Sequence, residues 1–181
     1  MDAVRQKIAA DFQLFDREVL AFTWVVNFPM FEKTDEGRRK FTHNPFSMPR
    51  IADLDDFVKQ ENIANILAQQ YDIVLNGHEL GGGSIRAHLP KLLQTTYEIM
   101  GYSPAEIERS VGHMLKAFTY GFPPHGGIAL GIDRLMMILQ QHSSLREIIA
   151  FPKTADGRDL MMKSPSPVSS DKLDLANIRL K

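Results

Sequence analysis

The sequence contains no cysteine among its 181 residues. Disulfide bonds and thiolate-bound metal ions are therefore excluded, and redox chemistry does not fix the compartment. The chain also has little net charge, because 21 basic side chains balance 22 acidic ones. A protein that binds nucleic acid by itself usually carries a basic excess, so this class is disfavoured, although a local patch could still contact RNA.

Long apolar runs are missing as well. No stretch of 18 apolar residues occurs, and the first residues lack the apolar core of a signal peptide. A soluble, cytoplasmic protein with no membrane contact is therefore expected. With 44% hydrophobic residues and no internal repeat, the chain suits a single domain over residues 1–181 with a sizeable core.

The pattern of apolar residues, glycine and proline predicts the elements along the chain. Residues 22–28 predict a buried strand, residues 32–40 predict a charged loop, and two prolines exclude a regular element at 43–49. Further strands are expected at 71–76, 79–86 and 127–132, and helices at 2–13, 53–70 (one or two short ones), 90–100, 103–120 and 135–139. This order predicts an α+β fold, an antiparallel β-sheet flanked by helices.

The strongest local signal is the dipeptide Asn-Gly at 76–77, which predicts a two-residue hairpin turn between the strands 71–76 and 79–86. Asp72 and Glu79 flank this turn on opposite arms, where their carboxylates could share one Mg2+ ion. Two solvated surface acids are the alternative. Three consecutive glycines lie in the second strand, and their entropic cost is tolerable where a ligand approaches the backbone.

Arg86 ends the second strand of the hairpin. Strict alternation places Glu79 and Arg86 on opposite faces, since their numbers differ by seven. A shared site therefore requires a β-bulge between them, for which the glycines are the natural place. The guanidinium of Arg86 is a candidate for binding a substrate carboxylate bidentately, and a surface ion pair is the alternative.

The segment 127–135 (GIALGIDRL) alternates small and large residues. On a strand, the aliphatic residues form a face that can be buried, and the other side is almost bare backbone on which a flat ring can lie. Arg134 follows near the start of a helix, where anions are favoured. These features together describe a nucleotide site, and a tightly packed internal strand is the alternative.

Two histidines are candidates for the same site. His43 lies on a loop beside a strand, and loops often carry binding residues, although a structural role is the alternative. His125 lies in a Pro-Pro-His-Gly turn and could line the nucleotide face. The remaining histidines show no spacing typical of metal ligands.

These motifs, in this order, resemble the bacterial-type aspartyl-tRNA synthetases of class II. The resemblance runs from about residue 22 to the C-terminus and rests on 24–32 (WVVNFPMFE), 43–47 (HNPFS), 71–77, 79–86, 120–127 (YGFPPHGG), 127–135 and 149–154 (IAFPKT). It implies part of a class II catalytic fold and an aspartate–tRNA ligase. Such an enzyme forms aspartyl-adenylate from aspartate and ATP, and then transfers the aspartyl group to the acceptor end of tRNA.

The resemblance also implies roles for single residues. Asp72 and Glu79 are similar to the acids that hold Mg2+ and ATP. Arg86 is similar to the catalytic arginine that binds the substrate carboxylate, and His43 to the histidine that closes over aspartate. The ATP-binding turn of motif 3 resembles Gly131, Ile132, Asp133 and the catalytic Arg134, which meets the terminal phosphate.

Several parts of the family pattern are absent from the sequence. The anticodon-binding OB-fold, the dimer motif 1 and motif 2, whose arginine binds the α-phosphate, are not found. The chain is therefore expected to be the C-terminal piece of a homodimeric synthetase, inactive alone: a truncated product, a split gene or an expression fragment. Asn44 stands where many bacterial members have a second histidine, so the choice between tRNA-Asp alone and both tRNA-Asp and tRNA-Asn stays open.

Two other functions remain as alternatives. A non-catalytic synthetase-like module would bind a nucleotide, an amino acid or a protein partner. The retained Asp72, Glu79, Arg86 and Arg134 favour half of an active site over such a module. A stand-alone ligase for small-molecule amidation would need a motif 2 arginine, which the sequence does not show.

Overall fold

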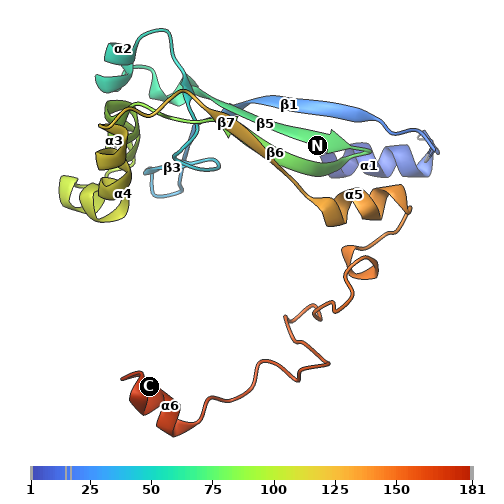
Figure 1. Ribbon diagram of the computed structural model, residues 1–181. Helices are drawn as coiled ribbons and strands as arrows, with labels where there is room; N and C mark the ends of the chain where they lie inside the picture. The colour runs from blue at the N-terminus through green and yellow to red at the C-terminus, as the bar shows by residue number, and fades with distance from the viewer. Residues whose placement is uncertain (1, 15, 17, 180–181) are drawn as a thin grey trace. The chain divides into compact units, whose positions relative to one another are not determined.

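The computed structural model describes residues 2–14, 16 and 18–179. The chain divides into two compact units, one ending at Gly131 and the other beginning at Ile132 (Figure 1). The expectation of a single domain over residues 1–181 stays a prediction. Across the described residues, every helix is too short or too polar to span a membrane.

An antiparallel sheet forms the centre of the first unit, with the strand order β1–β5–β6–β7 and β4 also paired to β5 (Figure 1). The predicted hairpin joins β5 to β6. Asn76 and Gly77 have φ values of 49° and 83°, as a type I′ turn requires at both central positions. The strands are β1 (Phe22–Pro29), β4 (Pro49–Arg50), β5 (Leu67–Leu75), β6 (His78–Ile85) and β7 (Gly126–Leu130).

Helices complete the first unit, and the expected α+β fold is confirmed. Two of them start at a proline, which is favoured in the first helical turn because its missing N–H has no partner there. The N-terminus of α4 also carries a capping box, in which the side chains of Ser103 and Glu106 each bind the other's backbone N–H. The helices are α1 (Asp2–Asp11), α2 (Leu54–Val58), the 3₁₀ turn η1 (Ile63–Asn65), α3 (Pro90–Ile99) and α4 (Pro104–Phe118).

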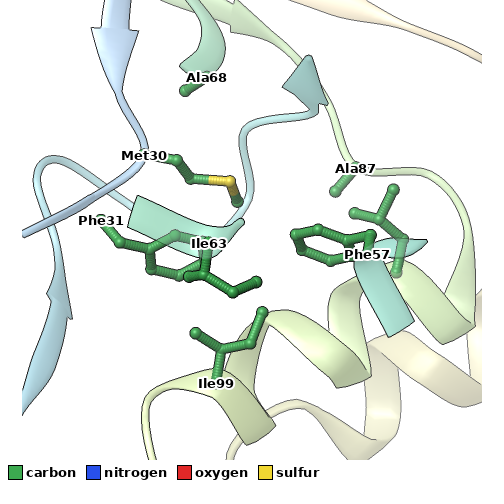
Figure 2. Packing of buried hydrophobic residues seen from close by; sticks show 8 residues of the cluster. Met30, Phe31, Phe57, Ile63, Ala68, Ala87 and Ile99 are labelled. Atoms are coloured by element: carbon green, nitrogen blue, oxygen red, sulfur yellow. The ribbon is translucent and has the colours of Figure 1, made fainter. Parts of the chain in front are cut away.

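Two buried apolar clusters hold α2, η1, α3 and α4. Figure 2 shows the first, to which α2 contributes Phe57, α3 contributes Ile99 and β5 contributes Ala68. Its members are Met30, Phe31, Phe57, Ile63, Ala68, Ala87, Leu92 and Ile99. The second cluster joins α3 to α4 through Leu93, Tyr97, Ile107, Val111 and Phe118. The first cluster therefore anchors the sheet where β5 begins.

The second unit contains α5 (Ile132–Leu139), the 3₁₀ turn η2 (Leu145–Glu147) and α6 (Ser170–Leu175). A helix directly after the glycine-rich strand is confirmed, although it starts at Ile132 and not at Leu135. Ser144 and Glu147 form a capping box at η2, and His142 Nδ1 lies 3.0 Å from Glu147 Oε2.

Two expectations about local structure are wrong. Residues 32–40 were expected to form a loop but contribute to a hairpin of β2 (Phe31–Lys33) and β3 (Arg39–Phe41), in which Glu32 pairs with Lys40 at 3.0 Å. Charged side chains tolerate a strand when they lie on its exposed face. Helix was also expected up to residue 70, but β5 already begins at Leu67, where pairing with β1 and β4 overrides local propensity.

The expected burial of two strands is also wrong. Trp24 and Val26 of β1 are exposed, as are Ile128 and Leu130 of β7, with exposed fractions of 42–57%. These four side chains lie on one face of the sheet together with Tyr71, as the strand register shows. We call this face the aromatic face. The strand assignments hold, but apolar composition predicts burial only where another layer covers the strand.

Candidate active site

The opposite face of the sheet carries the two acids of the hairpin. Asp72 of β5 pairs with Gly82 of β6, which pairs with Ala129 of β7, so these residues form a row across three strands. Directly paired residues point to the same side of a sheet. We call this side, with Asp72, Glu79, Gly82, Gly127 and Ala129, the acidic face.

A β-bulge directly follows Glu79 in β6. The register changes from Ile73 opposite Gly81 to Val74 opposite Glu79, which leaves Leu80 as an extra residue in β6. The predicted bulge between Glu79 and Arg86 is therefore confirmed, at a position directly before the glycines. Glu79 shares the face of its partner Val74 and of Asp72, and since a bulge reverses the alternation, Gly82 lies on the same face.

The two carboxylates converge over Gly82. A Cβ atom added to Gly82 would lie 2.6 Å from Asp72 Oδ1 and 3.9 Å from Glu79 Oε1. Only a glycine leaves room for both acids in this position. The observed arrangement therefore differs from two acids that point independently into solvent.

The electrostatics of Asp72 show which charges lie near it. Burial raises the pKa of the Asp72 carboxyl, the neighbouring Glu79 raises it further, and His43 lowers it. His43 itself packs edge-on against Phe28, with 5.0 Å between the ring centroids. Loop 43–49 therefore brings His43 within electrostatic range of the acid pair.

Two carboxylates that converge in this way form a candidate cation site. Oxygen ligands are what Mg2+ prefers, and it commonly takes one or two carboxylates together with substrate phosphates. Neutralising the pair would also remove the repulsion that raises the pKa of Asp72. The described residues contain no group of three or more His, Cys, Asp or Glu side chains that could hold a metal. Such a cation would therefore draw its other ligands from a substrate or from water.

The three glycines of β6 serve different purposes. Gly81 and Gly83 face the aromatic face, where added Cβ atoms would lie 2.9 Å from Leu130 Cδ2 and 2.8 Å from Tyr71 Cε2, respectively. The Tyr71 hydroxyl donates to the Gly127 carbonyl at 3.1 Å, so its ring passes over Gly83. Close packing on the aromatic face therefore accounts for glycine at positions 81 and 83. Of the three glycines, only Gly82 supports the expected approach of a ligand to the backbone.

Strand β7 offers open backbone on the acidic face. An added Cβ at Gly127 would meet no atom within 4 Å, and Ala129 is exposed. The strand lies at the edge of the sheet, and its end is fixed by the Gly131 N–H, which donates to the Leu80 carbonyl at 2.7 Å. A flat ring could therefore lie on β7 beside the acid pair.

Arg86 lies at a junction of three segments. Its N–H donates to the His125 carbonyl at 2.9 Å, and its carbonyl lies 3.4 Å from His88 Nδ1. It also forms an isolated β-bridge with Ser47. Alternation along β6 after the bulge assigns Arg86 to the acidic face. The main chain of Arg86 is thus held from both sides.

The candidate residues are divided between the two units. The first unit contains His43, Asp72, Glu79, Arg86 and Gly131, and the second contains Ile132, Asp133 and Arg134. The last three lie in the first turn of α5, and the N-terminus of a helix can bind an anion. The His125 ring packs edge-on against Phe122 at 4.8 Å, and its Nδ1 lies 3.0 Å from the Pro123 carbonyl.

Sequence reasoning missed the residues that support His43 and Arg86. Phe28 provides the aromatic surface under His43, and Ser47, which is fully buried, bridges to Arg86. The side-chain oxygen of Asn44 accepts hydrogen bonds from the Phe46 N–H and the Ser47 hydroxyl. The Asn-Pro dipeptide is a known turn signal and could have revealed the role of Asn44.

Comparisons with known proteins identify the family of the chain. Residues 2–155 match the family model of the class II tRNA synthetases (D, K and N). The aspartate–tRNA(Asp/Asn) ligase of Phenylobacterium zucineum is 48% identical over 98% of this chain, and that of Chlorobaculum parvum is 46% identical over 99%. The chain spans about 30% of the length of these relatives.

Solved structures show the same fold. The aspartyl-tRNA synthetase of Entamoeba histolytica matches 87% of this chain with a TM-score of 0.56 and 22% identity, and 26% of that chain is covered. The asparaginyl-tRNA synthetase of the same organism, in complex with asparaginyl-adenylate, matches 79% with a TM-score of 0.55 and 21% identity, and 27% of it is covered. The family-model match over most of its length shows that the chain belongs to the class II tRNA synthetases of the D, K and N type.

Proposed function

We propose that this chain forms part of the active site of an aspartate–tRNA ligase. The observation that carries the proposal is the convergence of Asp72 and Glu79 over Gly82, beside the open backbone of β7. Relatives that share 46–48% of their residues with the chain are named aspartate–tRNA(Asp/Asn) ligases. We therefore extend the proposal to a complete enzyme that charges both tRNA-Asp and tRNA-Asn, working in the cytoplasm as a homodimer.

The proposed first step joins aspartate to the α-phosphate of ATP and releases pyrophosphate. Little acid–base chemistry is needed, so positioning and charge neutralisation do most of the work. Asp72 and Glu79 would hold Mg2+, which offsets the negative charge of the triphosphate when bound. The adenine ring would lie on the bare side of β7, next to Gly131.

The amino acid would be recognised by two other side chains. Arg86 can bind the side-chain carboxylate of aspartate with two parallel charged hydrogen bonds, a geometry that lysine does not reproduce. His43 would close over the substrate from the loop that precedes β4. In motif 3, the turn of Gly131, Ile132 and Asp133 would bind ATP, and Arg134 would meet its terminal phosphate. The second step transfers the aspartyl group to the 3′ end of tRNA.

A hybrid enzyme tests this proposal. In it, the chain replaces the matching segment of the Phenylobacterium zucineum ligase, which supplies the remaining length. We expect aspartate-dependent exchange of pyrophosphate into ATP by the hybrid enzyme. The 181-residue chain alone should be slower by at least about 10²-fold, because the sequence shows no motif 2 arginine to stabilise the developing charge.

The outcomes separate the functions. Exchange by the hybrid enzyme with aspartate but not with asparagine or lysine supports the ligase. A hybrid enzyme without exchange, together with a chain that still binds ATP or aspartate, would favour a non-catalytic binding module. Exchange by the chain alone at the rate of the hybrid enzyme would contradict the view that the chain holds only part of the site.

A further inference from the structure

The loop of residues 43–48 contains a turn that is closed by a single side chain. Asn44 Oδ1 accepts a hydrogen bond from the Phe46 N–H at 3.0 Å and another from the Ser47 hydroxyl at 3.2 Å. This is an Asx-type turn, in which an asparagine side chain replaces a backbone acceptor. Asn44 therefore determines the shape of the loop between His43 and Ser47.

The far side of this turn is bonded to β6 around Arg86. The Ala87 N–H donates to the Phe46 carbonyl, and the Met48 N–H donates to the Ile85 carbonyl, both at 2.8 Å. Ser47, whose exposed fraction is 0%, lies between these two bonds and bridges to Arg86. The segment 46–48 thus moves with the strand end that carries Arg86.

The near side of the turn carries His43. Its ring contacts Phe28, and its charge affects Asp72, so its position matters for the acidic face. Only Asn44 and Pro45 separate His43 from the segment bonded to β6. Proline has no N–H to donate, so the side chain of Asn44 supplies the contacts that fix this short connection.

We propose that Asn44 is a positioning residue that sets His43 relative to Arg86 and thereby tunes the affinity for the amino acid substrate. This inference rests on the proposed function of both residues in binding aspartate. Removing the Asn44 oxygen leaves the Phe46 N–H and the buried Ser47 hydroxyl without their acceptor, and such groups are costly to leave unpaired. The short connection between Thr42, whose N–H donates to the Met30 carbonyl at 3.2 Å, and the segment bonded to β6 then relaxes, and this connection carries His43.

Kinetics of the hybrid enzyme test this inference. Asn44→Ala is expected to raise the KM for aspartate about tenfold, with kcat and the KM for ATP changed less than about twofold. Asn44→Ser should recover part of the loss, because a serine hydroxyl forms the same kind of turn more weakly. Asp53→Ala is the matched control, since Asp53 accepts from the Asp55 N–H in a similar turn at the start of α2.

A second test is a spectroscopic measurement on the 181-residue chain, which does not depend on enzyme activity. The His43 ring protons lie near the Phe28 ring and therefore experience its ring current. Asn44→Ala should shift these proton signals toward values of an exposed histidine, and Asp53→Ala should leave them in place. Unchanged His43 signals in Asn44→Ala would overturn the inference, whether or not the hybrid enzyme is active.

The kinetic and the spectroscopic test together distinguish the role of Asn44 from the proposed function on which it rests. A hybrid enzyme that is active but shows the same KM for aspartate in Asn44→Ala would overturn the role of Asn44 alone. Equal losses of kcat and of affinity for both substrates, also seen in Asp53→Ala, would indicate a general structural effect and overturn it too. A wild-type hybrid enzyme without aspartate-dependent exchange would refute the proposed function, and the His43 signals would still decide whether Asn44 positions the loop.

Discussion

Gly82 and Gly83 are neighbours in β6, yet alanine should act differently at each. A Cβ on Gly82 would meet Asp72 Oδ1 at 2.6 Å, which is the far end of a side chain that can rotate away. A Cβ on Gly83 would strike the Gly127 carbonyl oxygen and lie 2.8 Å from the Tyr71 ring. The backbone of a paired strand cannot move aside in the same way.

These contacts determine the expected magnitudes. Overpacking against a fixed backbone typically costs about 1–3 kcal/mol, and we expect this loss of unfolding free energy for Gly83→Ala. For Gly82→Ala the cost should stay below about 1 kcal/mol, because alanine also reduces the entropy of the unfolded chain. Gly127→Ala is the matched control, since its Cβ would meet no atom within 4 Å.

Two assays on the same variants check the prediction. Urea unfolding of the 181-residue chain at neutral pH gives the stability order, with Gly83→Ala the least stable. Pyrophosphate exchange by the hybrid enzyme should rank the variants differently, because Gly82→Ala displaces the Asp72 carboxylate and should raise the KM for Mg2+-ATP about tenfold or more. Gly82→Ala with normal exchange, or with a stability loss equal to that of Gly83→Ala, would refute the convergence of the two acids.

Three further predictions concern charged side chains. The pKa of Asp72 is raised, so its carboxyl favours the folded state when it is protonated and loses this contribution as the pH rises through its folded pKa. Asp72→Asn should therefore be more stable than the wild type in urea at pH 7 and as stable as the wild type near pH 3. Arg134→Ala in the hybrid enzyme should weaken ATP binding more than adenosine binding in calorimetry, and equal losses would contradict a phosphate role. Arg86→Lys should lower the selectivity for aspartate over asparagine in exchange assays, whereas a purely structural Arg86 predicts a lower Tm at unchanged selectivity.

Short-range signals predicted much of the fold. The Asn-Gly turn at 76–77 identified the central hairpin, and Ser103 with Pro104 identified the start of α4. Such signals depend on the backbone conformations that a few residues adopt, so they can be read locally. The placement of Asp72 and Glu79 on the two arms of the hairpin followed from the same turn.

The burial of side chains and the extent of strands could not be predicted from such local signals. The apolar side chains of β1 and β7 resemble those of internal strands, yet Trp24 and Leu130 are more than half exposed. Whether a face is covered depends on residues distant in sequence, and composition alone does not contain that information. The same reason explains why the start of β5 at Leu67 was missed, since its pairing with Pro29 and Arg50 is a tertiary contact.

The bulge at Leu80 connects these observations. The two-residue turn already sets Glu79 opposite Val74, on the face of Asp72, and without the bulge Gly82 and Arg86 would lie on the aromatic face. The bulge interrupts the ladder of β5 and β6 and brings Gly82 to the side of the two like charges, where burial and the neighbouring Glu79 raise the pKa of Asp72. Neither the interrupted ladder nor the pair of like charges stabilises the sheet. Local departures from regular pairing are expected where a site must be assembled, and here the departure lies between Glu79 and Arg86, which it brings to one face.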